Sequence, residues 1–205
     1  MSSATRVACG LVLASCVATA MAAAQGASAQ FGVGASLTIP VGDFHSDANG
    51  DGFKAGWQGI ALVEVRPRGS PLGFRVDGTY GQNSSNDQLN ADLTAAVGAP
   101  TTAKIKLLGG TADVTYHFRR SSGGVAGYVV GGVGVYNVKL AVTSGGVTAD
   151  SSETKIAWNV GMGLTYAVGG AALFFEARYV DVAKSFDAAK TPFIPITAGV
   201  RFGGK

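Results

Sequence analysis

Residues 158–166 read WNVGMGLTY, in which every second residue is large and apolar and the residues between are small or polar. Side chains along a β-strand point alternately to opposite faces, so this pattern predicts a strand with one apolar face. Gly169-Gly170 can adopt positive φ in a two-residue turn. The chain then alternates again, with an apolar face made of Leu173, Phe175, Ala177 and Tyr179. The two segments therefore predict a β-hairpin with an aromatic, apolar face.

The N-terminal segment has the features of a cleavable signal peptide. Arg6 gives a positive start, and residues 7–24 are apolar and rich in alanine. Residues 22–24 (Ala-Ala-Ala) and 27–29 (Ala-Ser-Ala) both fit the small-x-small rule of signal peptidases. Cleavage after Ala24 is possible, but the strand pattern begins at Phe31, so we predict cleavage after Ala29. Residues 1–29 are then the signal peptide and residues 30–205 a single domain.

Two other interpretations of this segment stay open. A retained membrane anchor would need a long span rich in Leu, Ile or Phe, and the segment lacks one. Leu13-Ala14-Ser15-Cys16 resembles the recognition site for lipid attachment at Cys16. The apolar run continues past Cys16, however, where a lipoprotein normally turns polar.

Composition limits the chemistry of the domain. Both cysteines, Cys9 and Cys16, lie in the signal peptide, so neither disulfides nor thiol chemistry is expected in the rest of the chain. The formal net charge of +3 falls to +2 without Arg6, which is too small to indicate nucleic-acid binding. After the signal peptide no apolar run approaches the length of a membrane helix. If the chain enters a bilayer, it enters as strands.

Eight alternating segments are expected to form strands, at residues 31–39, 53–66, 74–82, 104–119, 126–140, 158–166, 173–179 and 193–202. Most are near the roughly 9–11 residues that cross a bilayer at a tilt. Long connections at 41–52, 83–103, 141–153 and 181–191 alternate with short ones at 67–73, 120–124 and 169–170. This alternation of long and short connections predicts an all-β fold, an eight-stranded antiparallel up-and-down barrel. The fifth segment is irregular, and a bulge near Gly131-Gly132 is one explanation.

Alternation alone does not distinguish a membrane barrel from a soluble one, and the polar face is informative here. It consists mostly of small residues, as the interior of an eight-stranded barrel requires. Its charges are of both signs, and buried charges must be paired. We therefore predict a lumenal charge network of Glu64, Arg66, Arg75, Asp77, Asp113, His117, Arg119, Glu176, Arg178 and Arg201.

The apolar face carries aromatic residues near the strand ends. Such residues form the two interfacial girdles of a barrel wall that faces lipid. The predicted lipid-interface aromatics are Phe53, Trp57, Tyr80, Tyr116, Phe118, Tyr136, Trp158, Tyr166, Tyr179 and Phe202. Closure would also satisfy every backbone amide, as a membrane demands. These features favour a membrane barrel over a soluble, lipocalin-like lipid carrier.

Several short motifs resemble the small outer-membrane β-barrels of the OmpA transmembrane domain/OmpX-like group. They are Gly32-x-Gly34 running into residues 40–44 (PVGDF), residues 177–179 (ARY) and residues 199–202 (GVRF). The resemblance implies an integral barrel in the outer membrane of a Gram-negative-type cell, with periplasmic termini. It also implies that Phe202 is an assembly signal for the barrel-assembly machinery, although residues 203–205 follow it. Members of the group differ in activity, so function stays open.

Residues 47–52 (DANGDG) match the first half of a calcium-binding loop. The twelfth position is Gln58 rather than a bidentate Glu, so a solvated turn is the preferred interpretation. We expect no metal and no cofactor.

An enzyme would need a nucleophile and a base in contact. The predicted domain contains only two histidines, His45 and His117. His45 lies in a loop, and His117 is expected to face the lumen and to bond Asp113 or another interior carboxylate. We predict no catalysis. The preferred hypothesis is a structural or surface-interaction barrel whose external loops contact ligands or partners; the alternatives are a narrow passive channel for small solutes and the soluble lipid carrier.

Overall fold

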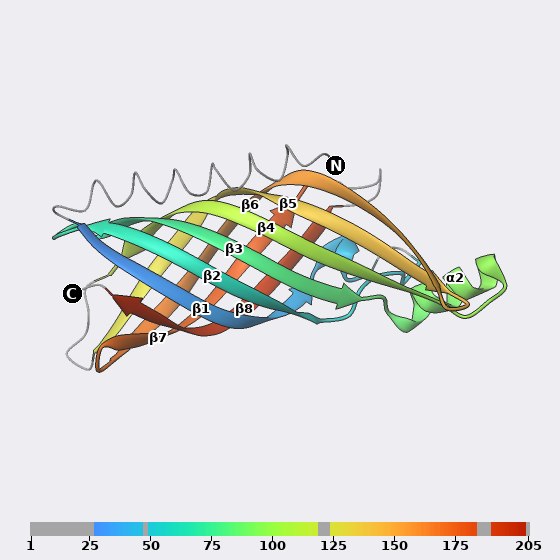
Figure 1. Cartoon of the computed structure of the whole chain (residues 1–205), viewed down its shortest axis with the longest axis horizontal. Helices are drawn as coiled ribbons and strands as arrows, with labels where there is room; N and C mark the ends of the chain where they lie inside the picture. Colours follow the sequence, from blue (N-terminus) through green and yellow to red (C-terminus); the bar gives the residue numbers. More distant parts are fainter. Residues whose placement is uncertain (1–26, 47–48, 119–123, 184–189, 204–205) are drawn as a thin grey trace.

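The computed structural model describes residues 27–46, 49–118, 124–183 and 190–203. In this part of the chain each strand pairs with the next, and the last closes on the first to make an antiparallel barrel (Figure 1). The strands are β1 Ala27–Pro40, β2 Gly56–Pro67, β3 Leu72–Ser84, β4 Thr101–His117, β5 Val125–Ser144, β6 Val147–Val168, β7 Ala171–Val182 and β8 Thr191–Gly203. The predicted fold class, an eight-stranded all-β barrel, is confirmed.

The seam between β1 and β8 runs from Gln30↔Gly203 to Pro40↔Phe193. This pairing removes the two free edges that an open sheet would expose, so the wall can meet lipid without unpaired backbone groups. Both ends of the described chain lie at the same end of the barrel, which we name the turn end. The opposite end, which carries the longer connections, is the loop end.

Two-residue glycine turns close both ends of β6. Val168 pairs with Ala171 across Gly169-Gly170, as predicted. At the other end, β5 and β6 stay paired to Ser144↔Val147 around Gly145-Gly146, whose φ angles are 55° and 83°. Positive φ at both central residues is the geometry of the hairpin turns that match strand twist. The loop predicted over residues 141–153 is therefore wrong: the strands continue there in polar residues, which give no apolar alternation.

The connection over residues 83–103 contains a helix, where the sequence predicted only a loop. The helix, α2, spans Asp87–Val97. The side chain of Asn86 accepts a hydrogen bond from the backbone N–H of Leu89, and Gly98 ends the helix with φ 77°. An Asn cap and a Gly terminator are the usual signals of helix ends. Among the described residues no helix has the length and apolar character to cross a membrane.

The fifth strand contains no bulge. β5 pairs without interruption with β4 from His117↔Tyr128 to Thr101↔Ser144, and its pairing with β6 is equally continuous. Tyr128, Val130 and Tyr136 face the lumen, whereas Val129, Val133 and Val135 face outward. The apparent irregularity has another cause: the inward face of this strand is itself apolar at several positions.

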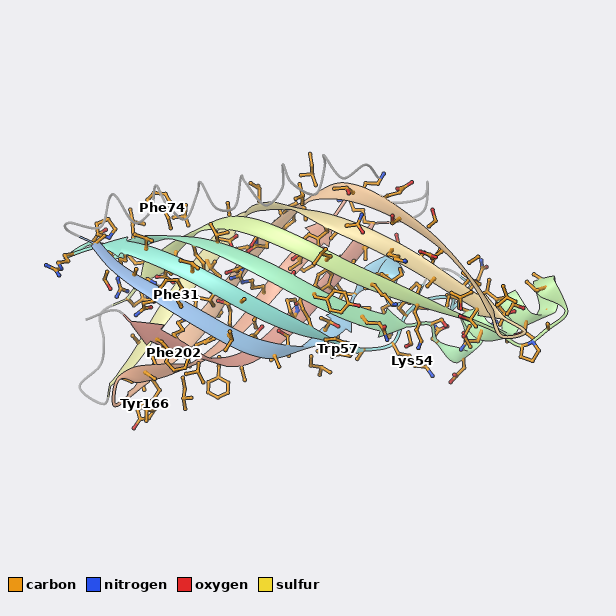
Figure 2. All side chains as sticks on the ribbon, in the orientation of Figure 1. Phe31, Lys54, Trp57, Phe74, Tyr166 and Phe202 are labelled. Carbon is orange, nitrogen blue, oxygen red and sulfur yellow. The ribbon has the colours of Figure 1, made fainter. Side chains whose placement is uncertain are left out.

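The outer wall of the barrel is apolar and aromatic. Figure 2 shows Phe31, Phe74, Tyr166 and Phe202 towards the turn end, and Trp57 towards the loop end. Seven of the predicted interface aromatics are between 43% and 54% exposed, namely Trp57, Tyr80, Tyr116, Phe118, Trp158, Tyr166 and Phe202. Tyr179 is half-buried and packs on Trp158, with ring centroids 5.4 Å apart. A continuous exposed apolar wall of this kind is suited to lipid rather than to water.

Two of the predicted interface aromatics do not face lipid. Tyr136 is buried inside the barrel, where its ring lies 6.1 Å from that of Phe193. Phe53 precedes β2 rather than starting it, and its ring packs 5.2 Å from Phe44. Both belong to an apolar cluster that fills the lumen near the loop end. We name this cluster the loop-end core; its members are Phe44, Ile105, Leu107, Tyr136, Val138, Ala157, Val180, Val182 and Phe193, with Phe53 and Leu140 packed against them.

Candidate functional site

The middle of the lumen holds seven charged side chains, none of them more than 6% exposed. We name them the charge layer: Glu64, Arg75, Asp77, Asp113, Glu176, Arg178 and Arg201. They point inward because each occupies an inward position of the strand alternation, and Arg75/Asp77 and Glu176/Arg178 are pairs two residues apart on β3 and β7. The layer therefore joins strands from opposite sides of the barrel.

Glu176 is the most heavily bonded carboxylate of the layer. Arg75 donates to it from two guanidinium nitrogens, at 2.6 Å to Oε2 and 3.3 Å to Oε1. Arg178 Nε donates to Oε1 at 2.7 Å, and the Tyr128 hydroxyl donates to Oε2 at 2.7 Å. A fork of two parallel bonds between Arg and a carboxylate is among the stronger polar contacts in proteins.

The two aspartates extend the same network. Asp77 accepts from Arg75 Nε at 2.6 Å and from Arg178 Nη2 at 2.7 Å. Asp113 accepts from Arg178 Nη1 at 3.0 Å and from Asn159 Nδ2 at 2.7 Å. Arg178 thus contacts three carboxylates at once, which compensates its desolvation.

Glu64 and Arg201 form the part of the layer nearest the turn end. Arg201 Nη1 donates to Glu64 Oε2 at 2.9 Å, and its Nη2 donates to the Tyr128 hydroxyl at 2.8 Å. The guanidinium also lies 4.7 Å from the centre of the Tyr128 ring and 4.9 Å from that of Phe174. His117 Nε2 lies 2.5 Å from Glu64 Oε1, and its ring stacks on Tyr128. Tyr128 therefore connects the two parts of the layer.

This arrangement closes the lumen. Beside the charge layer lies a cavity of about 20 Å³, lined in part by Thr79, Thr111 and Tyr136. A space of that size holds about one water molecule. Beyond it, towards the loop end, the loop-end core fills the barrel with apolar side chains. A solute would have to displace paired charges and then a packed apolar layer.

Two residues of the predicted charge network lie elsewhere. Arg66 is half-buried and lines a vestibule of about 900 Å³ at the turn end, and it forms no ion pair within the described part of the chain. Arg119 lies outside the described residues. His117, expected to bond Asp113 or another interior carboxylate, contacts the interior carboxylate of Glu64.

Sequence reasoning missed the neutral members of the network. Tyr128, Asn159 and Thr111 each bond a buried charge. A signal was visible for Asn159 and Thr111, which are polar residues on the polar faces predicted for their strands. Tyr128 carried no such signal, because it lies in a strand that is apolar on both faces.

The structure describes the calcium-like loop only in part, and it describes both histidines. Asp47 and Ala48 of the calcium-like loop lie outside the described residues, and the Asn86 side chain bonds the Gly50 carbonyl at 2.8 Å. The described residues contain no group of three His, Cys, Asp or Glu side chains suited to a metal. His45 ends the short 3₁₀ helix Gly42–Phe44, and the ring partner of His117 is a carboxylate rather than a nucleophile.

At the loop end the sheet continues past the barrel. β6 pairs with β7 no further than Ala157↔Val182, whereas β5 and β6 remain paired to Ser144↔Val147. The hairpin of residues 138–156 therefore extends beyond the last β6–β7 pair, with the start of β4 paired along its β5 strand to Thr101↔Ser144, at the same end as α2 (Figure 1). Residues 145–152 at its tip are all exposed. This projecting hairpin and α2 form the outermost surface of the molecule.

Comparison with known proteins places these features in context. The family model described as "Outer membrane protein beta-barrel domain" matches residues 9–202. Among solved structures, neisserial surface protein A is 23% identical with a TM-score of 0.59, over 87% of this chain and 99% of that one. A major outer membrane protein from Thermus thermophilus is 14% identical with a TM-score of 0.56, over 85% and 99% of the two chains.

A third similar structure is that of Ail, the attachment invasion locus protein of Yersinia pestis, in complex with the heparin analogue sucrose octasulfate. It is 16% identical with a TM-score of 0.52, over 87% of this chain and 100% of that one. No curated protein sequence matches. At these identities the structural neighbours share the fold alone.

Proposed function

We propose, from the premise that this chain belongs to the outer membrane protein β-barrel domain family, that it serves as a structural and surface-interaction protein of the outer membrane. Its external loops would contact ligands or partner proteins, without catalysis. The observation that carries this proposal is the contrast between the filled lumen and the exposed loop end. The lumen is filled by the charge layer and the loop-end core, whereas the loop end projects a paired, exposed hairpin.

A passive channel is the second candidate, and the packing of the lumen opposes it. The charge layer crosses the barrel with bonds between β3, β7 and β4, so its side chains are held from several sides. Moving them aside would leave buried charges without partners, which is costly. The cavity of about 20 Å³ beside the charge layer is too small for a solute larger than water.

The proposed orientation places the turn end, and with it both chain termini, in the periplasm. β1 and β8 meet at this end through Gln30↔Gly203, with Phe202 on the outer wall one residue earlier in β8. An exposed aromatic residue there is available to the barrel-assembly machinery, for which we propose it as the signal. The projecting hairpin then faces the exterior of the cell.

Cysteine labelling tests this orientation, because the described residues contain no cysteine. Thr148→Cys at the hairpin tip should react with a membrane-impermeant maleimide on intact cells. Ser70→Cys, in the turn between β2 and β3, should react only after the outer membrane is permeabilised. The reverse pattern would overturn the orientation.

Shortening the hairpin tests the interaction role. Replacing residues 142–149 by Asn-Gly rejoins the cross-strand pair Ala141↔Asp150 through a favoured two-residue turn. The removed residues pair with each other and, outside them, only with Thr101–Ala103 at the start of β4. The closed part of the barrel keeps all its strand pairs, so it should still fold and still migrate as a compact species on unheated gels. Because Ail was solved with a heparin analogue, adhesion of expressing cells to heparin-coated surfaces is the readout. We expect adhesion to fall to the level of cells lacking the protein; equal adhesion with the shortened hairpin would contradict the proposal.

A further inference from the structure

The lysines of the described residues lie at the loop end. They are Lys54, Lys104, Lys106, Lys139, Lys155 and Lys190, all on loop-end halves of strands or in loop-end connections. Most have an acidic partner. Lys54 pairs with Asp87, Lys155 with Glu153 and Lys190 with Asp181, at 2.7, 2.9 and 3.0 Å. The hydrogen bond to Asp181 also raises the pKa of Lys190.

Three of these lysines form a cluster on the outer face of β4 and β5, which we name the lysine cluster: Lys104, Lys106 and Lys139. Lys106 and Lys139 are directly opposite each other in the register, and Lys104 lies two residues from Lys106 on the same face. Side chains opposite each other on antiparallel strands have Cβ atoms about 4.5–5.5 Å apart, and like charges in such pairs repel. Lys139 is paired with Asp150, but Lys104 and Lys106 form no ion pair with any described residue.

The cluster begins where the apolar wall ends. Leu108, the next outward residue of β4, is 58% exposed, and Val135 on β5 lies on the same wall. On the other side, Lys106 is in register with Gln82, which in turn is in register with Trp57. Trp57 packs edge-on against Tyr80, the kind of aromatic pair found at a membrane interface. Lys104 and Lys106, which form no ion pair with any described residue, therefore lie next to the part of the wall that meets lipid headgroups.

We propose that the lysine cluster binds the phosphate groups of an anionic glycolipid of the outer leaflet, whose acyl chains lie against the wall at Leu108 and Val135. Phosphate oxygens would relieve the repulsion between Lys106 and Lys139. The Gln82 and Ser84 side chains, in register with Lys106 and Lys104, can donate further hydrogen bonds. The location in the outer leaflet rests on the orientation proposed above, but the binding of phosphate does not.

The test uses the full mature chain, folded in detergent micelles, so its outcome is independent of orientation in cells. The probe is lipid A, the phosphorylated glycolipid, and the readout is its dissociation constant by thermophoresis. Each lysine near an anionic lipid surface contributes about fivefold in affinity. The double variant K104Q/K106Q should therefore bind lipid A about 30-fold more weakly, while the matched control K54Q/K155Q removes the same charge and should change affinity less than about twofold.

Wild-type protein supplies a second measurement that needs no variant. It should bind lipid A at least about tenfold more tightly than dephosphorylated lipid A, since two lysines without ion pairs are involved. Equal binding of the two lipids, or equal losses in the two double variants, would overturn the proposal. So would displacement of lipid A by sucrose octasulfate at lower concentration than by free lipid A, since the cluster would then be a site for a polyanionic sugar.

Discussion

Glu176 accepts hydrogen bonds from Arg75, Arg178 and Tyr128, and because it is only 3% exposed it has no access to bulk water. The substitution Glu176→Gln keeps its shape but removes the charge that two guanidinium groups share. Removing one member of a buried ion pair costs about 3–5 kcal/mol. We expect a loss of that size in the free energy of unfolding, measured by urea denaturation in lipid vesicles with tryptophan fluorescence.

The matched control is Asp87→Asn, which breaks the pair with Lys54 at the exposed start of α2. Exposed ion pairs contribute roughly 0–1 kcal/mol, so the control should change stability by no more than that. A loss in Glu176→Gln no larger than in the control would mean that the charge layer does not hold the barrel together.

Gly163 is a position where the wall of the lumen closely approaches Tyr128. A Cβ atom there would overlap the Tyr128 ring, and the ring is held by its bonds to Glu176 and Arg201. Overpacking of a filled interior costs about 1–3 kcal/mol, so we expect Gly163→Ala to lower the free energy of unfolding by that amount. Gly78→Ala is the control, because a Cβ at Gly78 meets no atom within 4 Å. Equal effects of the two substitutions would contradict the packing described.

At the scale of single elements, β4 shows why strand period alone misplaced Tyr136 on the outer wall. From Thr101 to Leu107 its apolar residues face inward and its lysines outward, as in a soluble barrel. From Leu108 onward the apolar residues face outward. The alternation keeps its period, so only the consecutive pair Leu107-Leu108 marks the change from a wall in water to a wall in lipid. The same change places Tyr136 and Phe193 inside, which strand period alone could not predict.

The strand count, the closure and the turn at Gly169-Gly170 could be predicted, because alternation and glycine pairs encode them locally. The helix α2 and the long β5–β6 hairpin could not be separated from loops, since their residues are polar and their stability depends on neighbours in space. The seven residues of the charge layer could be predicted, because charges of both signs occur on the polar face of the strands. Tyr128 was missed because no local pattern reports a hydroxyl that joins two buried ion pairs.

The first strand bears on the maturation of the chain. β1 begins at Ala27, but its seam with β8 begins at Gln30↔Gly203. Cleavage after Ala29 would therefore remove three residues of β1 and leave the seam whole. We predict Gln30 as the N-terminus of the protein purified from outer membranes, determined by mass spectrometry of the intact chain. A mature chain beginning at Gln25 would show that the whole of β1 is retained.

At the scale of the whole molecule, the barrel combines two kinds of interior. In the membrane-spanning part, lipid outside requires an apolar wall and confines the charges to the paired layer within. Beyond the membrane, water outside permits lysines on the wall and an apolar core within. Both interiors are filled with packed side chains. The projecting hairpin and the lysine cluster lie together at the loop end of this barrel.

The sealed lumen is the central claim, and conductance of the purified, folded protein in planar lipid bilayers tests it most directly. The packed charge layer and the loop-end core predict a baseline that cannot be distinguished from that of a protein-free bilayer, at either sign of the applied voltage. Steady single-channel steps that scale with the amount of folded protein would contradict the account, because ions would then pass where the structure places paired charges and apolar side chains.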